Sequence, residues 1–431
     1  MSNIDYSDPN NTPPIGQAVP LGLQHVLAMF ASNVTPSIIV AGAAGLAFGG
    51  AEQIYLIQMA MLFAGIATLF QTIGIGPIGA RLPIMQGTSF AFVGVLAGVA
   101  ATQGLSVALT ACIIAGLIHF SLGSVIQKLR FMFPPLVTGL VILAIGLYLI
   151  SVAIKYAAGG AADFQMAADS FGSLLHWTVA LTVVVVSLAC KFMTKGLISN
   201  AAILIGLIAG YIVAVFSGMV SFGGVENAKW FQLPAVMPYG FEFSLGAVIG
   251  VTLVSLVSAI ETIGDTSATT KAGSERDATD AEISGATYAD GLGTAVAGVF
   301  GGLPNTSFSQ NVGIVGMTGI MSRHVVTIAG IIMIICGLIP KIGAVISSMP
   351  LPVLGGGVIV MFGMVAAAGM NMLSTVSMNR RNMIIISVSL AVGLGLNLVP
   401  SAVQHLPGIW KTLATSAVAP TALLAVIMNL V

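Results

Sequence analysis

The sequence predicts an all-α polytopic membrane protein with about 14 transmembrane segments, arranged as a seven-plus-seven inverted repeat. Three observations support this fold class: the composition, a series of apolar runs, and two motifs that recur at nearly one interval. Of the 431 residues, 57% are hydrophobic and 6% are charged, and the mean hydropathy is +1.04, whereas soluble domains carry about 25% charged residues. So few charges cannot cover a water-facing surface, and we expect lipid to surround the chain. The formal net charge is zero, which gives no reason to expect a nucleic acid as partner.

The apolar runs give the expected spans, because a helix needs about 20 mostly apolar residues to cross a membrane. They lie at residues 18–40, 52–73, 83–100, 105–126, 133–152, 177–194, 198–219, 245–264, 284–300, 305–320, 325–346, 351–372, 382–398 and 410–430. The third and tenth are short and contain Gly, Pro, Ser and Thr, so we expect a short extended stretch in each. Residues 1–16 are polar and lack Lys and Arg, unlike the basic start of a cleavable signal, which favours a cytoplasmic tail.

The basic residues indicate the orientation, because cytoplasmic loops carry an excess of Lys and Arg. With the N-terminus inside, ten of them face the cytoplasm: Arg81, Lys128, Arg130, Lys191, Lys195, Lys271, Arg276, Arg323, Arg380 and Arg381. Four face outside: Lys155, Lys229, Lys341 and Lys411. This distribution predicts a multi-pass protein of the cell (inner) membrane, with both termini in the cytoplasm.

Two pairs of motifs indicate the internal repeat. Gly87-Thr88-Ser89-Phe90-Ala91-Phe92 in the third span and Asn305-Thr306-Ser307-Phe308-Ser309-Gln310 in the tenth share Thr-Ser-Phe at an offset of 218 residues. Pro135 opens the fifth span and Pro352 the twelfth, at an offset of 217. An odd number of spans in each half gives the halves opposite topology, and interrupted segments at matching positions mark binding sites in transporters. The alternative is a pair of kinked helices packed through small residues.

Ionisable residues within the spans are the next candidates, because charges there are costly and usually functional. Glu261 and Asp265 in the eighth span are spaced i, i+4 and share one helix face. Two such carboxylates cannot both ionise easily in a low dielectric, so one is expected to hold a proton; alternatively, both are solvated at the cytoplasmic end. Asp290 in the ninth span either takes a proton or hydrogen-bonds Ser, Thr or backbone groups near the tenth span. His25 in the first span is expected to have a supporting structural role.

The remaining reactive residue types show no catalytic pattern. Cys112, Cys190 and Cys336 are widely separated within or beside apolar runs, and we expect them to serve in packing. No spacing resembles a metal site, no phosphate-binding Walker loop occurs, and no nucleophile–base pair is visible. We therefore expect no enzyme activity, no catalytic residue, no metal and no cofactor.

Four of these segments match the motifs of one family. Gln310-Asn311-Val312-Gly313 continues to Thr318-Gly319, and this segment resembles the signature of the nucleobase–ascorbate transporter family, in which Gln or Glu precedes Asn-x-Gly-x-x-x-x-Thr. Gln24-His25 resembles that family's first-helix motif. Glu261-Thr-Ile-Gly-Asp265 resembles its eighth-helix carboxylate motif, and Ala289-Asp290-Gly291 its ninth-helix motif. The four segments extend over most of the chain in the expected order.

The resemblance implies a two-domain architecture. Spans 1–4 and 8–11 would form a core domain that holds substrate (residues 17–127 and 245–347). Spans 5–7 and 12–14 would form a gate domain (128–244 and 348–431), and family members are commonly homodimers. It also implies site residues. Glu261 would accept N–H bonds from a nucleobase, Gln310 would hydrogen-bond another edge, and Ser89, Phe90 and Ala91 would line the site through backbone N–H groups and an aromatic face.

For the remaining residues the resemblance implies indirect roles. Asp265 and Asp290 would serve proton coupling and site organisation, with Asn311 and His25 in support. The expected function is import of an oxidised purine, xanthine or uric acid, by proton symport, although sodium is not excluded as the coupling ion. Uracil carriers of the family tend to have Glu and His where this chain has Gln310 and Asp265. A uracil:proton symporter is the alternative, and an anion transporter of a related fold is a weaker one, because the carboxylates would repel an anion.

Overall fold

The computed structural model describes residues 7–431 except 133, 161–162 and 165. Its first half consists of α1 (Ile15–Ala43), α2 (Ala51–Ile73), β1 (Gln86–Thr88), the 3-10 helix η1 (Phe90–Phe92), α3 (Val93–Gln103), α4 (Leu105–Leu122), α5 (Ile126–Leu129), η2 (Arg130–Met132), α6 (Pro135–Ala157), α8 (Leu174–Met193), α9 (Leu197–Asn200), α10 (Ala202–Phe216) and α11 (Gly223–Asn227). The second half consists of α12 (Leu245–Ser274), α13 (Asp280–Val299), β2 (Asn305–Ser307), α14 (Ser309–Thr318), α15 (Arg323–Gly337), α16 (Pro340–Ser347), α17 (Leu351–Ser374), α18 (Arg380–Leu398), η3 (Pro400–Val403), α19 (Gly408–Thr415) and α20 (Val418–Leu430).

Within these described residues, eight helices are long and apolar enough to cross a membrane: α1, α2, α4, α6, α8, α12, α17 and α18. The pair α15 and α16 becomes a ninth candidate if the two helices, bent by 79° at their junction, form one span. Every segment expected from the sequence overlaps at least one helix. The chain is therefore a multi-pass membrane protein.

Three of the expected spans are interrupted at points that the hydropathy pattern did not reveal. The segment 198–219 contains the break between α9 and α10 at Ala201. The segment 325–346 contains the break between α15 and α16, where Pro340 begins the second helix. Proline has no N–H to continue a helical ladder, and its ring disfavours helical backbone in the preceding residue. The segment 410–430 is broken between α19 and α20 at Ala417, whose φ of 59° lies in the left-handed region. The expectation that each of these segments forms one continuous helix was therefore wrong.

The third and tenth segments come together in the middle of the molecule. Strands β1 and β2 pair antiparallel, with Gln86 opposite Ser307 and Thr88 opposite Asn305, and all six strand residues are buried. Each strand leads into a short helix, η1 followed by α3 in one case and α14 in the other. Because extended chain cannot satisfy its backbone groups in lipid, such a segment is tolerated only where protein surrounds it, and the strand pair meets that condition.

The helices pack in two groups around this pair. The strands, α1, α2, α4, α12, α13 and α15 contact one another, and α6, α8, α10, α17, α18 and α20 form the second set. The most extensive contact in the second group is between α6 and α17, where Gly146 lies against Ala366 and Gly355 against Ala157. A Cβ at either glycine would collide with the neighbouring backbone, so small residues permit this close approach, as is usual between membrane helices.

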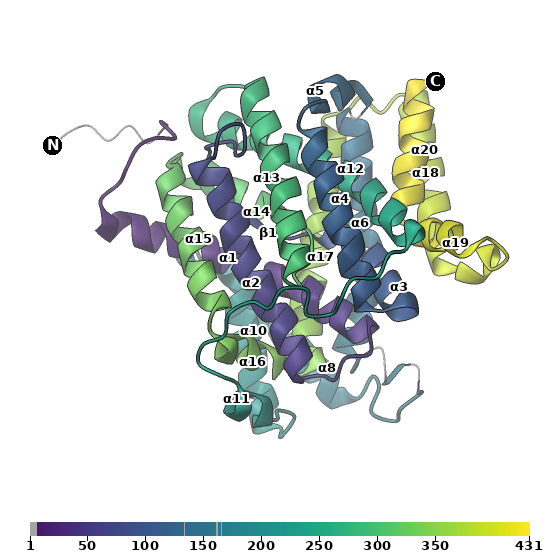
Figure 1. Ribbon diagram of the computed structural model, residues 1–431. Coiled ribbons are helices and arrows are strands. Elements are labelled where there is room, and N and C mark those ends of the chain that lie inside the picture. The colour runs from purple at the N-terminus through teal and green to yellow at the C-terminus, as the bar shows by residue number, and fades with distance from the viewer. Residues whose placement is uncertain (1–6, 133, 161–162, 165) are drawn as a thin grey trace.

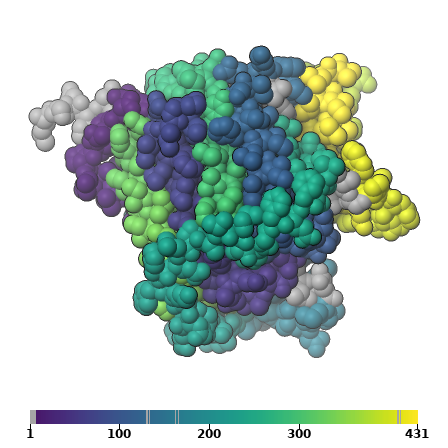
Figure 2. All heavy atoms as spheres, in the orientation of Figure 1, coloured from purple at the N-terminus to yellow at the C-terminus, as the bar shows by residue number. Residues whose placement is uncertain are grey.

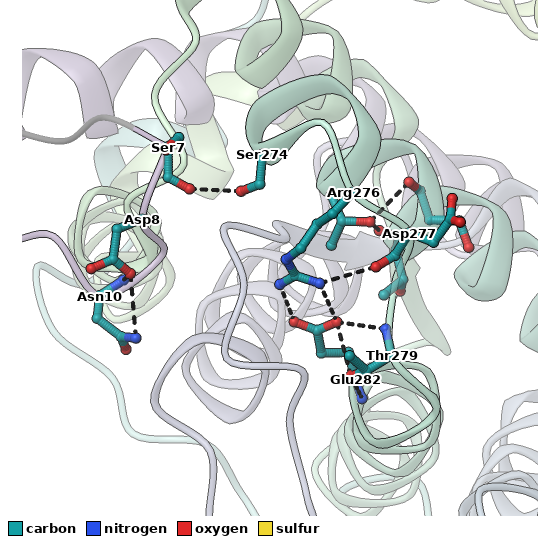
Figure 3. Close-up of polar contacts among 11 residues, drawn as sticks. Ser7, Asp8, Asn10, Ser274, Arg276, Asp277, Thr279 and Glu282 are labelled. Atoms are coloured by element: carbon teal, nitrogen blue, oxygen red, sulfur yellow. Dashed lines mark hydrogen bonds and ion pairs between the residues drawn. The ribbon is translucent and has the colours of Figure 1, made fainter.

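At one end of the molecule the amino-terminal tail is bonded to α12 and α15. The hydroxyl of Ser274 at the end of α12 donates to the carbonyl of Ser7 at 2.6 Å. The backbone N–H of Arg323 at the start of α15 donates to the carbonyl of Pro9 at 2.9 Å. Arg276 pairs with Glu282 beside these contacts (Figure 3). The described start of the tail and the C-terminus both lie toward the upper side in Figure 1.

The opposite end is crossed by the connection between α10 and α12, which forms the teal band over the lower front of Figure 2. This segment is bonded to several helices as it passes. The backbone N–H groups of Gln232 and Met237 donate to the carbonyls of Leu338 and Val299, respectively. The N–H of Glu242 donates to the hydroxyl of Thr110. The connection thereby holds helices of the first group together.

Candidate functional site

A cavity of about 230 Å³ lies where the broken segments face α6 and α17. Its lining combines residues of β1, η1, β2 and α14 with Glu261 of α12 and apolar side chains of α6 and α17: Thr88, Ser89, Phe90, Ala91, Ile142, Ile145, Glu261, Thr306, Ser307, Phe308, Ser309, Gln310, Met364, Val365 and Ala368. All five residues expected to touch substrate from the sequence lie in this lining. The structure does not place Asp265, Asp290, Asn311 or His25 in it.

The η1 wall of the cavity is built by a local cap. Ser89 is the N-cap residue of η1, and its hydroxyl accepts a hydrogen bond from the Ala91 N–H at 3.3 Å. The Ser89 N–H donates to the carbonyl of Pro304 at 2.9 Å. These two N–H groups are therefore engaged within the protein. The Phe90 N–H, in contrast, has no partner among the described residues.

The aromatic side of the wall is Phe90 itself. Its ring meets that of Phe362 on α17 edge-on, with centroids 5.2 Å apart and planes at 89°. Edge-to-face contacts of this kind are favourable beyond the area they bury. Phe362 therefore fixes the orientation of the Phe90 ring at the border between the two groups of helices.

Helix α14 begins at the other side of the cavity. The cap position, Phe308, supplies no side-chain cap, and the first N–H groups of a helix have no acceptor within it. Ser309 and Gln310 carry two of these N–H groups and also line the cavity. A helix N-terminus favours negative charge or an electronegative oxygen, so this wall can receive a ligand acceptor.

Glu261 supplies the acceptor side of the cavity. It is half-buried on α12, and its carboxylate has no hydrogen-bond partner in the described part of the chain. Asp265, one turn further, is buried and accepts the hydroxyls of Ser307 and Ser309, both at 2.7 Å. The shared helix face expected from the i, i+4 spacing therefore carries one free carboxylate and one that is already bonded to β2 and α14.

Asp290 on α13 is fully buried and bonded on both oxygens. Its Oδ1 accepts the side-chain N–H groups of Gln71 at 3.0 Å and Gln86 at 2.5 Å, and its Oδ2 accepts the hydroxyl of Thr262. Of the two roles expected for Asp290, the hydrogen-bonding one placed its partners near the tenth span, whereas these partners come from α2, β1 and α12. Gln71 and Gln86 were missed; their only signal was an amide within an otherwise apolar run.

A second polar pair supports the start of α14. The Asn311 Nδ2 lies 3.0 Å from both the Nδ1 and the carbonyl oxygen of His25 on α1, and both residues are buried. Asn33 on α1, which no sequence motif marked, accepts the Thr88 N–H at 2.8 Å and donates to the carbonyl of Ala60 at 3.0 Å. Helix α1 is thus hydrogen-bonded to both broken segments, to Thr88 of β1 and to Asn311 of α14.

The apolar residues of α6 and α17 that line the cavity were also missed, because nothing in an apolar run distinguishes a residue facing a ligand from one facing lipid. The described residues contain no group of three or more His, Cys, Asp or Glu side chains that could hold a metal ion. The arrangement offers hydrogen bonds and apolar contact, which suits reversible binding of a small polar ring.

Comparison with known proteins gives the family. A model described as "Permease family" (Xan_ur_permease) matches residues 16–427. The uric acid permease PucK of Bacillus subtilis is 37% identical over 415 residues, 96% of this chain and 95% of the relative. The xanthine permease of the same organism is 35% identical, covering 96% and 94%.

A solved structure supports the fold. The transmembrane domain of the cyanobacterial bicarbonate transporter BicA superposes with a TM-score of 0.64 and 14% sequence identity, covering 97% of each chain. At that identity the likeness concerns the fold alone. The family model and the permease relatives, in contrast, match the sequence over nearly its whole length. The chain belongs to the nucleobase–ascorbate transporter family.

Proposed function

We propose that this protein is a secondary transporter that imports an oxidised purine, xanthine or uric acid, by proton symport across the cell membrane. The observation that carries the proposal is the presence of Glu261 and Gln310 in one cavity, neither with a hydrogen-bond partner in the described part of the chain. The names of the relatives, a uric acid permease and a xanthine permease, support the class of substrate.

The chemistry of the cavity suits such a ring. Xanthine and urate are planar and present adjacent N–H and C=O groups at their edges. The Glu261 carboxylate can accept two N–H bonds in one plane, and the Gln310 amide can both donate and accept. Hydrogen bonds to a charged group are the stronger kind. The Phe90 ring offers an apolar face, and the N–H groups of Phe90 and of the first turn of α14 offer donors to ring carbonyls.

The proton sites of this proposal are Asp265 and Asp290, with Asn311 and His25 as supporting residues. Both carboxylates are buried and hydrogen-bonded to the broken segments. A change of charge on either would therefore alter the hydrogen bonds that position the residues lining the cavity. The proposal requires neither a cofactor nor a metal, and no enzyme activity. Sodium in place of the proton is an outcome of the experiment below.

The proposed architecture comprises 14 spans in a seven-plus-seven inverted repeat. The core domain would contain residues 17–127 and 245–347, the gate domain 128–244 and 348–431, and residues 1–16 a cytoplasmic tail. The packing of the helices in two groups and the pairing of β1 with β2 support this division. We further propose a homodimer with both termini in the cytoplasm, by analogy with the family.

Uptake into proteoliposomes tests the function. Purified protein is reconstituted, and labelled xanthine, urate and uracil are offered with an inward proton gradient, an inward sodium gradient, or neither. We expect xanthine or urate to accumulate only when the proton gradient is present, and a Glu261→Gln variant to lose this uptake. Accumulation of uracil in preference to both purines, or accumulation driven by sodium alone, would replace the corresponding part of the proposal.

A further inference from the structure

Thr262 lies between the carboxylate of Asp290 and the turn of α12 that carries Glu261. Its Oγ1 contacts two acceptors: Asp290 Oδ2, and the carbonyl of Ser258 one turn earlier in the same helix at 3.1 Å. A threonine hydroxyl has a single hydrogen, so it can donate to only one of them at a time. Which acceptor receives it depends on whether Asp290 carries a proton.

The other oxygen of Asp290 directs the proton to this side. Oδ1 already accepts two amide N–H groups, those of Gln71 and Gln86. The Gln71 amide is held in place on both ends, because its Nε2 also donates to Ala286 at 3.0 Å and its Oε1 accepts the Ala80 N–H at 3.1 Å. A proton therefore binds more readily to Oδ2, which accepts only the Thr262 hydroxyl, than to Oδ1, which accepts two amide N–H groups.

With the proton on Oδ2, the hydrogen bond reverses. The Asp290 O–H donates to Thr262 Oγ1, and the threonine hydroxyl rotates to donate to the Ser258 carbonyl. No covalent bond of Thr262 is made or broken, and every polar group at this place keeps a partner. The Gln86 Oε1, which is buried and lacks a partner among the described residues, could accept a proton on Oδ1 only if the whole amide turned, which is the larger rearrangement.

The consequence for the cavity follows from the position of Glu261. A hydroxyl bonded to the carbonyl four residues earlier bends a helix slightly, and the turn from Ser258 to Thr262 contains Glu261. Ser258 is also tied to β2, because its hydroxyl donates to Thr306 Oγ1 at 3.1 Å, and Thr306 lines the cavity. Reversal of the Thr262 bond thus acts on the turn that presents Glu261 to the ligand.

We propose that Thr262 is the positioning residue that couples proton occupancy of Asp290 to substrate binding at Glu261. This inference rests on the proposed function. The other titratable groups near Asp290 are Glu261 and Asp265 on α12 and His119 on α4. The backbone of His119 lies against Gly291. Helix α2 and strand β1 contribute only the uncharged amides of Gln71 and Gln86.

The chain offers a matched control on the same helix. Thr266, one turn further, is also fully buried and donates to the carbonyl four residues earlier, that of Thr262, at 2.7 Å. Its hydroxyl makes no hydrogen bond to a carboxylate in the described part of the chain. Thr266→Val therefore removes the same kind of bond from the same helix and leaves Asp290 untouched.

The test measures equilibrium binding of labelled xanthine and urate to purified protein from pH 5.5 to 8.5, for the wild type, Thr262→Val, Thr262→Ser and Thr266→Val. Coupling between two sites commonly changes affinity about 5- to 150-fold, which such a titration resolves. We expect the affinity of Thr262→Val to lose most of its pH dependence while purine binding persists. Thr262→Ser, which retains the hydroxyl, and Thr266→Val should both keep the wild-type pH profile.

Three results would overturn the inference: an unchanged pH profile in Thr262→Val, an equal loss in Thr266→Val, or a failure of Thr262→Ser to preserve the profile. Size-exclusion chromatography checks folding, and Thr262→Ala serves if the valine variant does not fold. The wild type separates this test from that of the proposed function. If the wild type binds neither purine, the proposed function is wrong; if it binds purine and only the variant pattern differs from expectation, the role of Thr262 is wrong.

Discussion

The carboxylates of Glu261, Asp265 and Asp290 lie within a few turns of α12 and α13 and differ mainly in what surrounds them. Asp265 accepts two hydroxyls, and Asp290 accepts two amides and one hydroxyl. Glu261 has no such partner in the described chain and lines the cavity. A buried carboxylate without donors is costly unless something else supplies them. We therefore regard Glu261 as the group whose partner is the substrate.

Removal of that acceptor gives the first prediction. Glu261→Gln keeps the shape of the side chain but loses the charge, and Glu261→Ala loses the acceptor as well. A ligand N–H left without a partner costs about 1–3 kcal/mol, and more when the lost partner was charged. We expect purine affinity to fall at least about tenfold in both variants, since 1.4 kcal/mol corresponds to that factor. Binding to purified protein measures this, and near-normal uptake by Glu261→Ala would contradict the assignment.

The side chain of Gln310 gives the second prediction, which concerns substrate choice. Its amide can pair with adjacent C=O and N–H groups, whereas an ionised Glu could only accept and would repel a ring carbonyl. Sites whose polar groups are left unpaired discriminate strongly. We expect unlabelled xanthine or urate to compete far better than uracil for uptake by the wild type.

The matching variant is Gln310→Glu. We expect it to weaken purine uptake more at neutral than at acid pH, because a protonated Glu regains a donor. Competition assays at two pH values measure both effects, with the wild type as the control at each. Equal competition by uracil, or an unchanged pH dependence in Gln310→Glu, would favour the uracil alternative.

At the scale of elements, the sequence predicted where the helical segments lie but not how each one is divided. Hydropathy indicates length in the bilayer, and it does not register a local break such as Pro340 or the left-handed backbone of Ala417. The Gly-, Ser- and Thr-rich composition of the third and tenth segments did predict chain that is not fully helical. The bonds that hold those segments, such as those to Asn33 on α1 and to Asp290 on α13, involve helices far away in sequence and could not be predicted.

The start of α13 carries a prediction outside the spans (Figure 3). Thr279 and Glu282 form a capping box, and Arg276 donates to both Glu282 oxygens, at 2.9 and 2.5 Å. Burial alone would raise the pKa of Glu282, but the hydrogen bonds from Arg276 and Thr279 outweigh it and lower the pKa below its usual value. Because the folded carboxyl binds its proton less readily than the unfolded one, its stabilising effect is full above about pH 4.3 and disappears as the pH falls through the folded pKa.

Glu282→Gln should therefore lower the free energy of unfolding by about 0.5–1 kcal/mol at pH 7, because glutamine can keep the capping box but loses the negative charge that pairs with Arg276 at the helix N-terminus. The difference from the wild type should shrink as the pH falls below about 4.3, where the unfolded carboxyl is protonated. Thermal unfolding in detergent across this pH range measures both. Asp277→Asn is the control, because Asp277 is 97% exposed and lies 3.9 Å from Lys271. A Glu282→Gln penalty that is constant with pH would refute the role of its charge.

At the scale of the whole molecule, the candidate site lies where the two groups of helices meet. The five lining residues expected from the sequence all belong to the broken segments and α12, which have polar residues to mark them. The opposite wall, with Ile142 and Met364, is apolar. It is formed by the packing of α6 and α17, which no sequence pattern predicts. A sequence motif can therefore reveal the side of a site that forms hydrogen bonds, whereas the side that provides shape depends on the packing of the entire fold.

The orientation of the molecule gives the final prediction. Asp277, between α12 and α13, and Asp169, between α6 and α8, are both exposed and lie in connections at opposite ends of the molecule (Figure 1). The excess of basic residues predicts that the Asp277 side faces the cytoplasm. In a variant without the three native cysteines, Asp169→Cys should react with an impermeant thiol reagent in intact cells, and Asp277→Cys only after the membrane is opened. Labelling of Asp277→Cys from outside would reverse the orientation, and labelling of both from one side would overturn the proposed number of spans between them.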